Sequence, residues 1–305
     1  MTVSGRPTVT SGFGRDNESP SNIFTTTKLQ TNGTVSASVL ASLPVNDEPV
    51  ITPSAGAGVT GTHKHTVACK ENMTSGSDAV TMTAWTDPTK LPSSGNYYLA
   101  TDVVLSSETS ISKSLTLCLN GHTITGAWNK RVIPVSGGTF NLMDCSEEES
   151  GAIIARGITW RGACLYVSGC TVNLYGGTMY GGIVNGDISK GTAGNGGGGC
   201  IYETSTAIVN MYGGRLVGGK SIEGVENSHG GNVCNMSKFN LYGGVIENGY
   251  SALRGGNVSF LEYAADKQSV LTGGIIRNGL VVGTGSNAAG GGNLSMNPGT
   301  SYADK

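Results

Sequence analysis

The sequence predicts an all-β protein: a right-handed parallel β-helix, that is, a solenoid of stacked coils, with an extended arm at its N-terminus. Three observations support this prediction. A motif of the form Val-Asn-Leu-Tyr-Gly-Gly occurs at residues 172–177 and returns with conservative changes at 209–214 and 239–244. Each copy alternates apolar and polar residues, as expected for a strand with one buried face. Glycine supplies 49 of the 305 residues, often as pairs that follow such strands.

Weaker copies extend the repeat to residues 271–274 in one direction and to 140–142 and 117–121 in the other. The copies align on Gly121, Asp144, Gly176, Gly213, Gly243 and Gly273, with steps of 23, 32, 37, 30 and 30 residues. Variable steps place insertions in loops while the strands stay fixed. Because no coil can bury its own inner face, equivalent residues must stack from coil to coil. The expected buried column contains Leu119, Leu142, Leu174, Met211, Leu241 and Leu271.

Two further strands are expected in every coil. One follows a second glycine pair, in the segments 230–233, 255–258 and 291–294, with 161–164 and 197–200 as earlier versions. The other is marked by a third apolar position, at Ile124, Met179, Leu216, Ile246 and Ile276. Asn232, Asn257 and Asn293 recur at one corner, where stacked amides can bond to each other and to the turn backbone. We interpret this asparagine column as structural.

Three regions follow from these patterns. Residues 1–62 are rich in Ser and Thr and form either an attachment arm that lies on a partner or a bare linker. Residues 63–110 include an aromatic stretch that is expected to cap the solenoid, because an open end exposes core and unpaired strand groups. Residues 111–305 form the β-helix. No comparable cap follows Leu294, so we expect either another subunit at that end or a longer natural chain.

Composition and charge exclude several classes of function. The net charge of −2 and the pI near 6.1 provide no basic field for nucleic acid. No run of about 20 apolar residues predicts a membrane span, and the first ten residues lack a secretory signal. The expected location is therefore a virion surface, reached without secretion, or a bacterial cell surface after removal of a signal.

Residues 91–99, residues 115–124 and the repeated Leu-Tyr-Gly-Gly units together resemble a known family. They are similar to the glycine-rich, pectate-lyase-like right-handed parallel β-helix domains of surface proteins in gut Gram-positive bacteria and their phages. The resemblance covers residues 91–295 and implies the fold. It leaves the function open, because such domains serve as stalks, adhesins, tailspikes and polysaccharide-cleaving enzymes. The homo-oligomer that we expect, with a trimer as one form, also comes from this resemblance.

Candidate chemical groups are few. Polysaccharide cleavage requires paired carboxylates or a calcium site with a base. The acidic residues of the coils fall at unrelated repeat positions: Asp144, Asp187, Glu203, Glu223, Glu226, Glu262 and Asp266. Glu247 and Arg277 share one repeat position in successive coils, which predicts an ion pair on the outer surface. The segment Glu147-Glu148-Glu149 is interpreted as a solvated loop, with calcium binding as the alternative.

Histidine and cysteine offer weaker candidates. His229 lies in a Ser-His-Gly-Gly sequence similar to the Gly-His-Gly of β-helix polygalacturonases, but the matching aspartates are missing. His63, His65 and Cys69 have a spacing that can hold a transition metal, without an evident fourth ligand. Cys164 and Cys200 align on one inward column as buried thiols, with a disulfide as the alternative, and Cys118 is expected at an outward or corner position.

The sequence thus predicts a non-enzymatic structural protein: a rod on a phage particle, as a head or tail decoration or fibre, or on a bacterial cell. It is expected to mediate adhesion to a host surface or glycan, and its arm to contact a capsid, a tail or a cell envelope. No catalytic, cofactor-binding or metal-binding residue is assigned, and no cofactor. The alternative function is a polysaccharide lyase or hydrolase whose site forms between subunits, with residues 180–199 and 220–228 as the loops to inspect.

Overall fold

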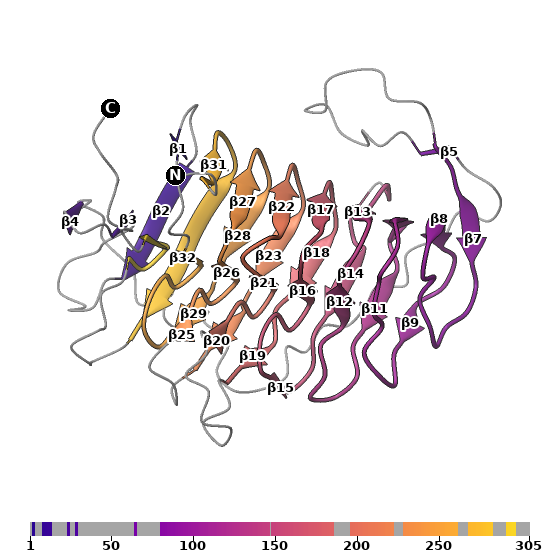
Figure 1. Ribbon diagram of the computed structural model, residues 1–305, viewed down its shortest axis with the longest axis horizontal. Helices are drawn as coiled ribbons and strands as arrows, with labels where there is room; N and C mark the ends of the chain where they lie inside the picture. Colours follow the sequence, from indigo (N-terminus) through magenta and orange to yellow (C-terminus); the bar gives the residue numbers. More distant parts are fainter. Residues whose placement is uncertain are drawn as a thin grey trace.

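The computed structural model describes residues 80–146, 148–185, 196–222, 228–261, 268–282 and 291–296, together with five short strands before residue 80. All regular structure in these residues is β-strand, and the main sheets are parallel. Figure 1 shows the strands of each sheet standing side by side in chain order, from purple to yellow. No helix of the described residues is long and apolar enough to cross a membrane.

The first sheet is the most continuous. Its strands are β7 (Thr83–Trp85), β8 (Gly95–Leu99), β10 (Leu115–Cys118), β13 (Thr139–Met143), β17 (Thr171–Leu174), β22 (Ile208–Met211), β27 (Lys238–Leu241) and β31 (Val270–Leu271). Each strand pairs in parallel with the strand of the next coil. The aromatic stretch before the repeat thus supplies β7 and β8, which form the first rungs of the same sheet.

The second sheet contains two parallel rows of strands. One row is β9 (Val103–Val104), β11 (Thr123–Thr125), β14 (Ala152–Ile154), β18 (Thr178–Tyr180), β23 (Arg215–Val217), β28 (Val245–Glu247) and β32 (Ile275–Val281). The other is β15 (Ile158–Thr159), β19 (Ile183–Val184), β24 (Lys220–Ser221) and β29 (Tyr250–Ser251), which joins the far half of β32. The coils from β14 to β28 therefore carry a fourth strand, beyond the three that the sequence predicted.

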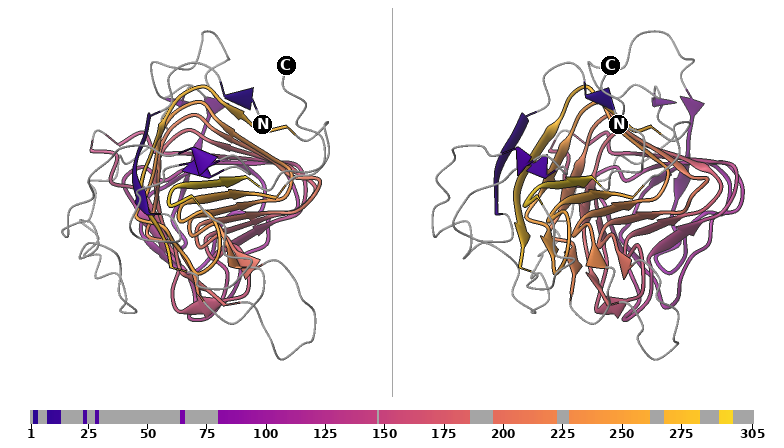
Figure 2. Two further views of the ribbon diagram at one scale, coloured as in Figure 1. Left: turned by 90° about the vertical axis from the view of Figure 1, so that its left-hand side faces the viewer. Right: turned by 60° about the vertical axis from the view of Figure 1, so that its left-hand side comes forward.

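The third sheet returns the chain to the first. Its strands are β12 (Ile133–Val135), β16 (Leu165–Val167), β21 (Ile201–Glu203), β26 (Val233–Asn235), β30 (Val258–Phe260) and β33 (Leu294–Met296). Two small pairs lie outside these three sheets: β20 (Gly196–Gly197) with β25 (Ser228–His229), and β5 (Lys64–His65) with β6 (Val80–Thr81). Viewed towards its end, the molecule shows the coils one behind another around a common interior (Figure 2).

Four short strands near the N-terminus lie at the opposite end of the molecule from β7. They are β1 (Thr2–Val3), β2 (Thr8–Phe13), β3 (Ile23–Phe24) and β4 (Lys28–Leu29). β1 pairs with β31, β2 with β32 and β3 with β33, all in parallel. Figure 1 shows β2, in indigo, alongside β32, in yellow. The strands that cover this end therefore come from the same chain, which the sequence analysis did not anticipate.

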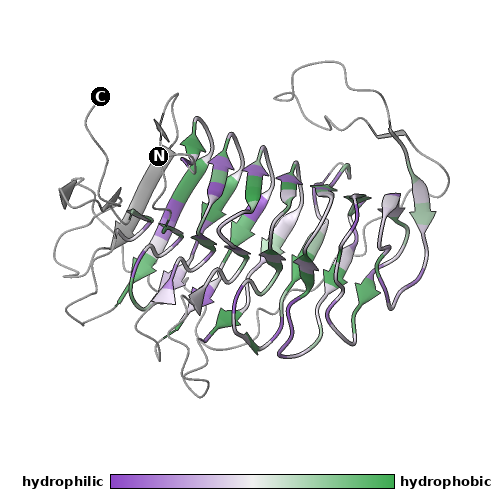
Figure 3. Ribbon diagram, in the orientation of Figure 1, coloured by the Kyte–Doolittle hydropathy of each residue, from purple (hydrophilic) through white to green (hydrophobic). Residues whose placement is uncertain are grey.

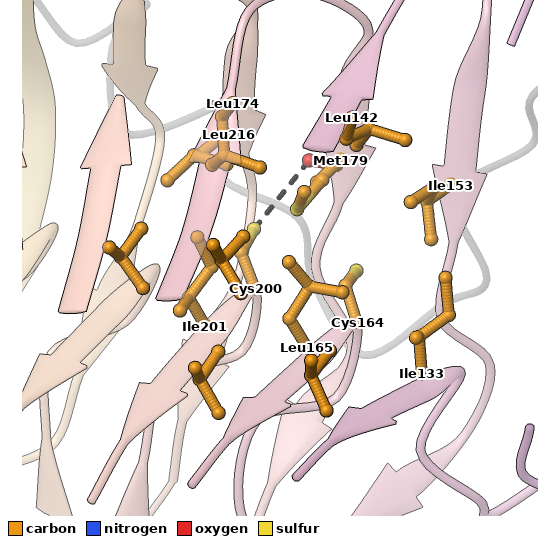
Figure 4. Close-up of a cluster of buried hydrophobic side chains, with 14 of the residues drawn as sticks. Ile133, Leu142, Ile153, Cys164, Leu165, Leu174, Met179, Cys200, Ile201 and Leu216 are labelled. Carbon is orange, nitrogen blue, oxygen red and sulfur yellow. Dashed lines mark hydrogen bonds between the residues drawn. The ribbon is translucent and has the colours of Figure 1, made fainter. Parts of the chain in front are cut away.

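The core is built from columns of equivalent apolar residues, as predicted (Figure 4). One residue of the expected column was wrong: the paired residues are Leu117, Leu142, Leu174, Met211, Leu241 and Leu271. Leu119 lies two residues further on, because Asn120 and Gly121 form an extra turn with positive φ that the alignment on Gly121 overlooked. The column from Ile124 to Ile276 is confirmed, and Ile153 belongs to it.

The corner before the third sheet is closed by the predicted asparagine column. Asn232 Nδ2 donates to Asn257 Oδ1 at 2.7 Å, and Asn257 Nδ2 donates to Asn293 Oδ1 at 2.8 Å. All three side chains are fully buried. Each oxygen that faces a neighbouring turn also accepts from a glycine N–H, for example Gly249 N to Asn257 Oδ1 at 2.9 Å. At this corner, a column of buried, fully hydrogen-bonded amides therefore takes the place of an apolar column.

The outer face of the first sheet carries polar and aromatic rows. Apolar and polar residues alternate along the strands of the molecule, as Figure 3 shows for β32 of the second sheet. On the first sheet, asparagine amides bond from coil to coil between 141, 173, 210 and 240. Tyr175, Tyr212 and Tyr242 stack with ring centroids 5.2 and 4.9 Å apart. Cys118 lies on this outer face, as predicted, but is fully buried as part of a second apolar cluster.

Candidate functional site

The most exposed apolar group of the described residues lies on one flank of the early coils. The side chains of Trp128, Ile158 and Trp160 are 54%, 47% and 39% exposed. Trp128 lies between β11 and β12, whereas Ile158 begins β15 and Trp160 follows it, one coil later. Exposed apolar residues that gather at one place on a soluble protein usually mark a binding surface. We call the surface formed by Trp128, Asn129, Arg156, Ile158, Trp160 and Arg161 the tryptophan corner.

Backbone contacts fix the two segments of the tryptophan corner against each other. Asn129 adopts φ of 56° and its backbone N–H donates to Arg156 O at 3.0 Å. Its side-chain Oδ1 accepts from Ile158 N at 2.8 Å. Gly157 has φ of +73°, and a Cβ there would collide with Asn129 Oδ1. The rings therefore project from a turn that is held in place by hydrogen bonds and by a required glycine.

Guanidinium groups lie over the aromatic rings of this flank. The Cζ atom of Arg156 is 5.7 Å from the ring centre of Trp128, and that of Arg161 is 4.3 Å from the ring centre of Trp160. Arg161 also lies 4.9 Å from the ring centre of Tyr202, so it is placed between two rings. These distances are within the range of cation–π attraction. Each exposed tryptophan thus has a cation beside it.

The aromatic and cationic series continues along the third sheet. Tyr166 and Tyr202 stack with ring centroids 5.7 Å apart and an angle of 2° between the rings. Arg131 lies 4.2 Å from the centre of the Tyr166 ring. Burial raises the pKa of Tyr202, with the neighbouring Cys234 adding to the shift, so this hydroxyl stays neutral. The outer face of β16 and β21 therefore supports the tryptophan corner from one side.

The local charge is positive although the chain is slightly acidic. The segments 126–131 and 155–161 contain Lys130 and three arginines and no acidic residue, in a chain of net charge −2. One carboxylate reaches this flank, because Glu108 Oε1 accepts from Arg131 N at 3.3 Å. Arginine presents a planar fork of donors that matches carboxylate, sulfate and phosphate groups. The face of an indole ring carries partial negative charge that attracts polarised C–H bonds, such as those on one face of a sugar ring. The tryptophan corner therefore combines the two chemistries that a charged sugar requires.

The ion pair predicted between Glu247 and Arg277 forms, and Arg277 is 43% exposed, but the carboxylate itself is buried. Arg277 Nε donates to Glu247 Oε2 at 2.7 Å, and Arg215, which the sequence analysis missed, pairs with Oε1. The Glu247 side chain is only 4% exposed. Burial raises the pKa of Glu247, but the hydrogen bonds and charges of the two arginines outweigh it and hold the pKa below its ordinary value. The carboxylate is fully engaged, so the cluster links three coils.

His229 lies in β25 and pairs through its backbone with Arg254. Burial, assisted by the charge of Arg254, lowers the pKa of His229 to about 3. The imidazole is therefore neutral at physiological pH and shielded from solvent. A general acid or base works best with a pKa near the operating pH and within reach of the substrate. The similarity to the polygalacturonase motif is not matched by such a site.

Other acidic candidates are structural or outside the described residues. Asp144 is buried, and its two oxygens accept from Gly121 N at 2.9 Å and Gly151 N at 2.6 Å, which fixes two turns. Glu203 is buried in the third sheet, and Glu148 and Glu149 are exposed. Five candidates lie outside the described residues: Asp187, Glu223, Glu226, Glu262 and Asp266. The same holds for Glu147 and for the side chains of His63, His65 and Cys69. Within the described part of the chain, no group of three or more His, Cys, Asp or Glu can hold a metal ion.

The cysteines follow the prediction in part. Cys164 and Cys200 lie on the inward column as free, fully buried thiols, so the alternative of a disulfide between them is not realised. Burial raises the pKa of Cys164 well above its ordinary value. Cys145, in contrast, is disulfide-bonded, and the sequence analysis did not expect a disulfide there. Cys200 Sγ contacts Asn232 Oδ1 at 3.2 Å, so the thiol continues the asparagine column into the earlier coils.

Sequence reasoning missed the tryptophan corner, although a signal was present. Trp128 and Trp160 each stand five residues before a strand of the third sheet, β12 at Ile133 and β16 at Leu165. They thus have the same sequence distance to paired strands of successive coils, and each has an arginine within four residues. The backbone nevertheless places Trp128 beside Arg156 and Gly157, and Trp160 lies in the extra residues that β15 adds to the next coil. A search for repeated aromatic residues outside the strands finds this pair. The glycine motifs indicate the strands and their corners but not these exposed residues.

Comparisons with protein-family models, curated proteins and solved structures find no match to this chain. The resemblance based on residues 91–99 and 115–124 therefore remains a prediction. The case for a function rests on the geometry of the tryptophan corner and on the stacked parallel sheets that hold it.

Proposed function

We propose that this chain is a right-handed parallel β-helix with an N-terminal arm, and that it acts as a non-enzymatic display rod for adhesion. The parallel pairing of each strand with its equivalent in the next coil supports a solenoid. The right hand is the one that parallel strand crossovers nearly always adopt. The rod is proposed to stand on a phage particle or a bacterial cell, in line with the family that residues 91–99 and 115–124 resemble.

One observation carries the adhesive role: two exposed tryptophans on the same flank of successive coils, each with a guanidinium group over its ring. Exposing large aromatic surface to water is unfavourable, so such a cluster is best explained by a ligand that covers it. Tryptophan and arginine also contribute the largest share of binding energy at protein interfaces. The proposed ligand is a glycan whose sugar rings stack on Trp128 and Trp160.

The arginines indicate the class of glycan. We propose that Arg156 and Arg161, whose guanidinium groups lie over the two rings, donate to oxygens of a stacked sugar; none of the residues that define the corner is acidic. We therefore propose a glycan that carries carboxylate, sulfate or phosphate groups. Interactions of this type weaken with salt, because exposed charges are screened over about 10 Å at 0.1 M ionic strength.

The test measures binding of the purified chain to immobilised polygalacturonate, alginate, heparin and dextran. We expect saturable binding to at least one of the acidic polymers, weaker binding to neutral dextran, and a loss of affinity as salt rises. The double substitution Trp128→Ala with Trp160→Ala should lower the affinity about 10- to 100-fold, equivalent to about 1–3 kcal/mol. Its stability should change by only about 0.5 kcal/mol, because both rings are exposed.

The control substitution is Val104→Ala, which trims an exposed apolar residue, 55% exposed, outside the tryptophan corner. Its affinity should equal that of the unmodified chain. If the tryptophan variant binds as well as the control, or if no acidic polymer binds, the adhesive role of this flank is wrong. Shortened polysaccharide products would instead favour the alternative function, a cleaving enzyme with a site between subunits.

A further inference from the structure

The N-terminal strands follow the path of one more coil. β1 adds to the first sheet, β2 to the second and β3 to the third, in the order that every internal coil follows. The register of β2 is set by Thr8 opposite Ile275 and Phe13 opposite Leu280. β4 then pairs antiparallel with β3 and forms the outermost strand of the third sheet. β1 to β4 thus supply the strands of a terminal coil at the end of the rod formed by β31, β32 and β33.

The sequence of β2 carries the signature of the coil it completes. Residues 9–13 read apolar, polar, polar, Gly, apolar, the same pattern as residues 276–280 and 246–250. Gly12 pairs with Gly279, which follows Gly249 by one coil. A Cβ at Gly279 would collide with Gly292 O, and one at Gly249 with Gly256 O. A glycine at position 12 is therefore what an additional coil in this register requires.

The contacts of this terminal coil do not depend on which copy of the chain supplies it. The described rod extends over seven steps of the first sheet from β31 to β7, about 34 Å at 4.8 Å per step. Residues 30–63 connect β4 to β5, and 34 residues can span up to about 110 Å when extended. The segment 2–29 can therefore reach the end of its own rod or that of a neighbouring rod.

We propose that the end of the rod formed by β31, β32 and β33 is an exchangeable docking site for residues 2–29, filled by a second copy of the chain when copies are crowded. A connection of this length corresponds to an effective concentration on the order of 1 mM for the segment's own rod end. Copies displayed on a particle less than about 120 Å apart reach a similar concentration. Exchange then links neighbouring copies by hydrogen bonds that the monomer already makes.

The proposal names the partner of the N-terminal arm within a larger assembly as another copy of this chain. It does not depend on the ligand of the tryptophan corner, and its test measures only whether two chains become linked. Thr8 and Ile275 are opposed on neighbouring parallel strands, at a Cα separation of about 4.8 Å that suits a disulfide. A cysteine pair at these positions forms a disulfide only if β2 lies on β32.

Two full-length chains are expressed together, one with Thr8→Cys and one with Ile275→Cys, each with its own affinity tag. After equilibration and oxidation, a disulfide between the two chains is measured on a non-reducing gel. We expect it in at most a few per cent of chains at about 10 μM and in tens of per cent at about 1 mM. The control pairs Thr8→Cys with Thr83→Cys, an exposed position on β7 at the far end, and should stay unlinked.

A single chain with both Thr8→Cys and Ile275→Cys distinguishes docking from exchange. It should form an internal disulfide at every concentration. If this internal disulfide forms but no link between chains appears at about 1 mM, the exchange is overturned. If neither disulfide forms, the docking of β2 on β32 is itself wrong, and glycan binding by the tryptophan corner is unaffected by either result.

Discussion

The same corner of the coil differs between the early and late parts of the rod. Arg161, Gly197, His229 and Arg254 pair along one row before the third sheet. In the early coils, Trp160 precedes this row and is 39% exposed. In the later coils, Ser228 precedes it and is buried, and its oxygen atoms bond to neighbouring turns. One position of the repeat therefore faces solvent in one coil and the interior in another.

The inward side of this corner also differs between the early and the late coils. Cys164 and Cys200 occupy it in the early coils, whereas Asn232, Asn257 and Asn293 occupy it later. The late coils use side-chain amides to satisfy the backbone of tight glycine turns. The early coils satisfy it through backbone bonds and use the freed outer side for aromatic residues. The late corner is thus the more fully hydrogen-bonded of the two, and the early corner is the one for which we propose binding.

Asn257→Ala should give the largest effect on stability. Asn257 bonds to Asn232, Asn293, Gly249 N and Arg277 O while fully buried. Alanine leaves these partners unsatisfied, which should lower the free energy of unfolding by about 4 kcal/mol. Denaturant unfolding measures the change. Asn173→Ala, in the half-buried row on the outer face, is the matched control and should cost about 1 kcal/mol. If the two substitutions lower the free energy of unfolding equally, the late corner has no special role in stability.

Glu247→Gln should have an intermediate effect. It leaves Arg215 and Arg277 without a carboxylate, and because both arginines are about half exposed, the cost should be about 2 kcal/mol. The lowered pKa of Glu247 means that this stability is present above its ordinary value of 4.5 and is lost as pH falls through the lower folded-state pKa. The difference between the two proteins should therefore shrink in acid. A difference that stays constant from pH 7 to pH 2 would contradict this account.

Tyr212→Leu should have the smallest effect. Tyr212 stacks between Tyr175 and Tyr242 on the outer face of the first sheet. Losing both ring contacts should cost about 1 kcal/mol and leave glycan binding unchanged, because this row is outside the tryptophan corner. Tyr212→Phe keeps the rings stacked and should match the unmodified chain. A loss of glycan binding in Tyr212→Leu alone would extend the binding surface to the tyrosine row.

Much of the fold could be predicted from the sequence because the glycine-pair motifs fix both the strand and the corner. The columns from Leu142 to Leu271 and from Ile124 to Ile276 follow from that alignment. The error at Leu119 arose where Asn120 and Gly121 imitate the glycine pair of later coils. A sequence pattern does not reveal that this turn is an insertion, because the two-residue shift keeps the apolar alternation intact.

The candidate site was less predictable for a physical reason. Burial and strand pairing impose a period on the sequence, whereas exposed residues such as Trp128 and Trp160 are free of that constraint. The pairing of β2 with β32 was also missed, because residues 9–13 contain only one glycine and resemble residues 276–280 only in their order of apolar and polar residues. The burial of the Glu247 carboxylate was missed because the reach of Arg215 from the preceding coil is a side-chain property that register alone does not show.

The most direct test of the account is hydrogen exchange measured with and without a saturating acidic polysaccharide that the chain binds. Amides of residues 127–131 and 156–161 should exchange more slowly in the complex, because the ligand covers the tryptophan corner. Amides of the equivalent late corner, residues 228–231 and 253–257, should exchange at the same rate in both samples. Protection of the late corner instead, or no protection at residues 127–131 and 156–161, would contradict the assignment of binding to the early coils.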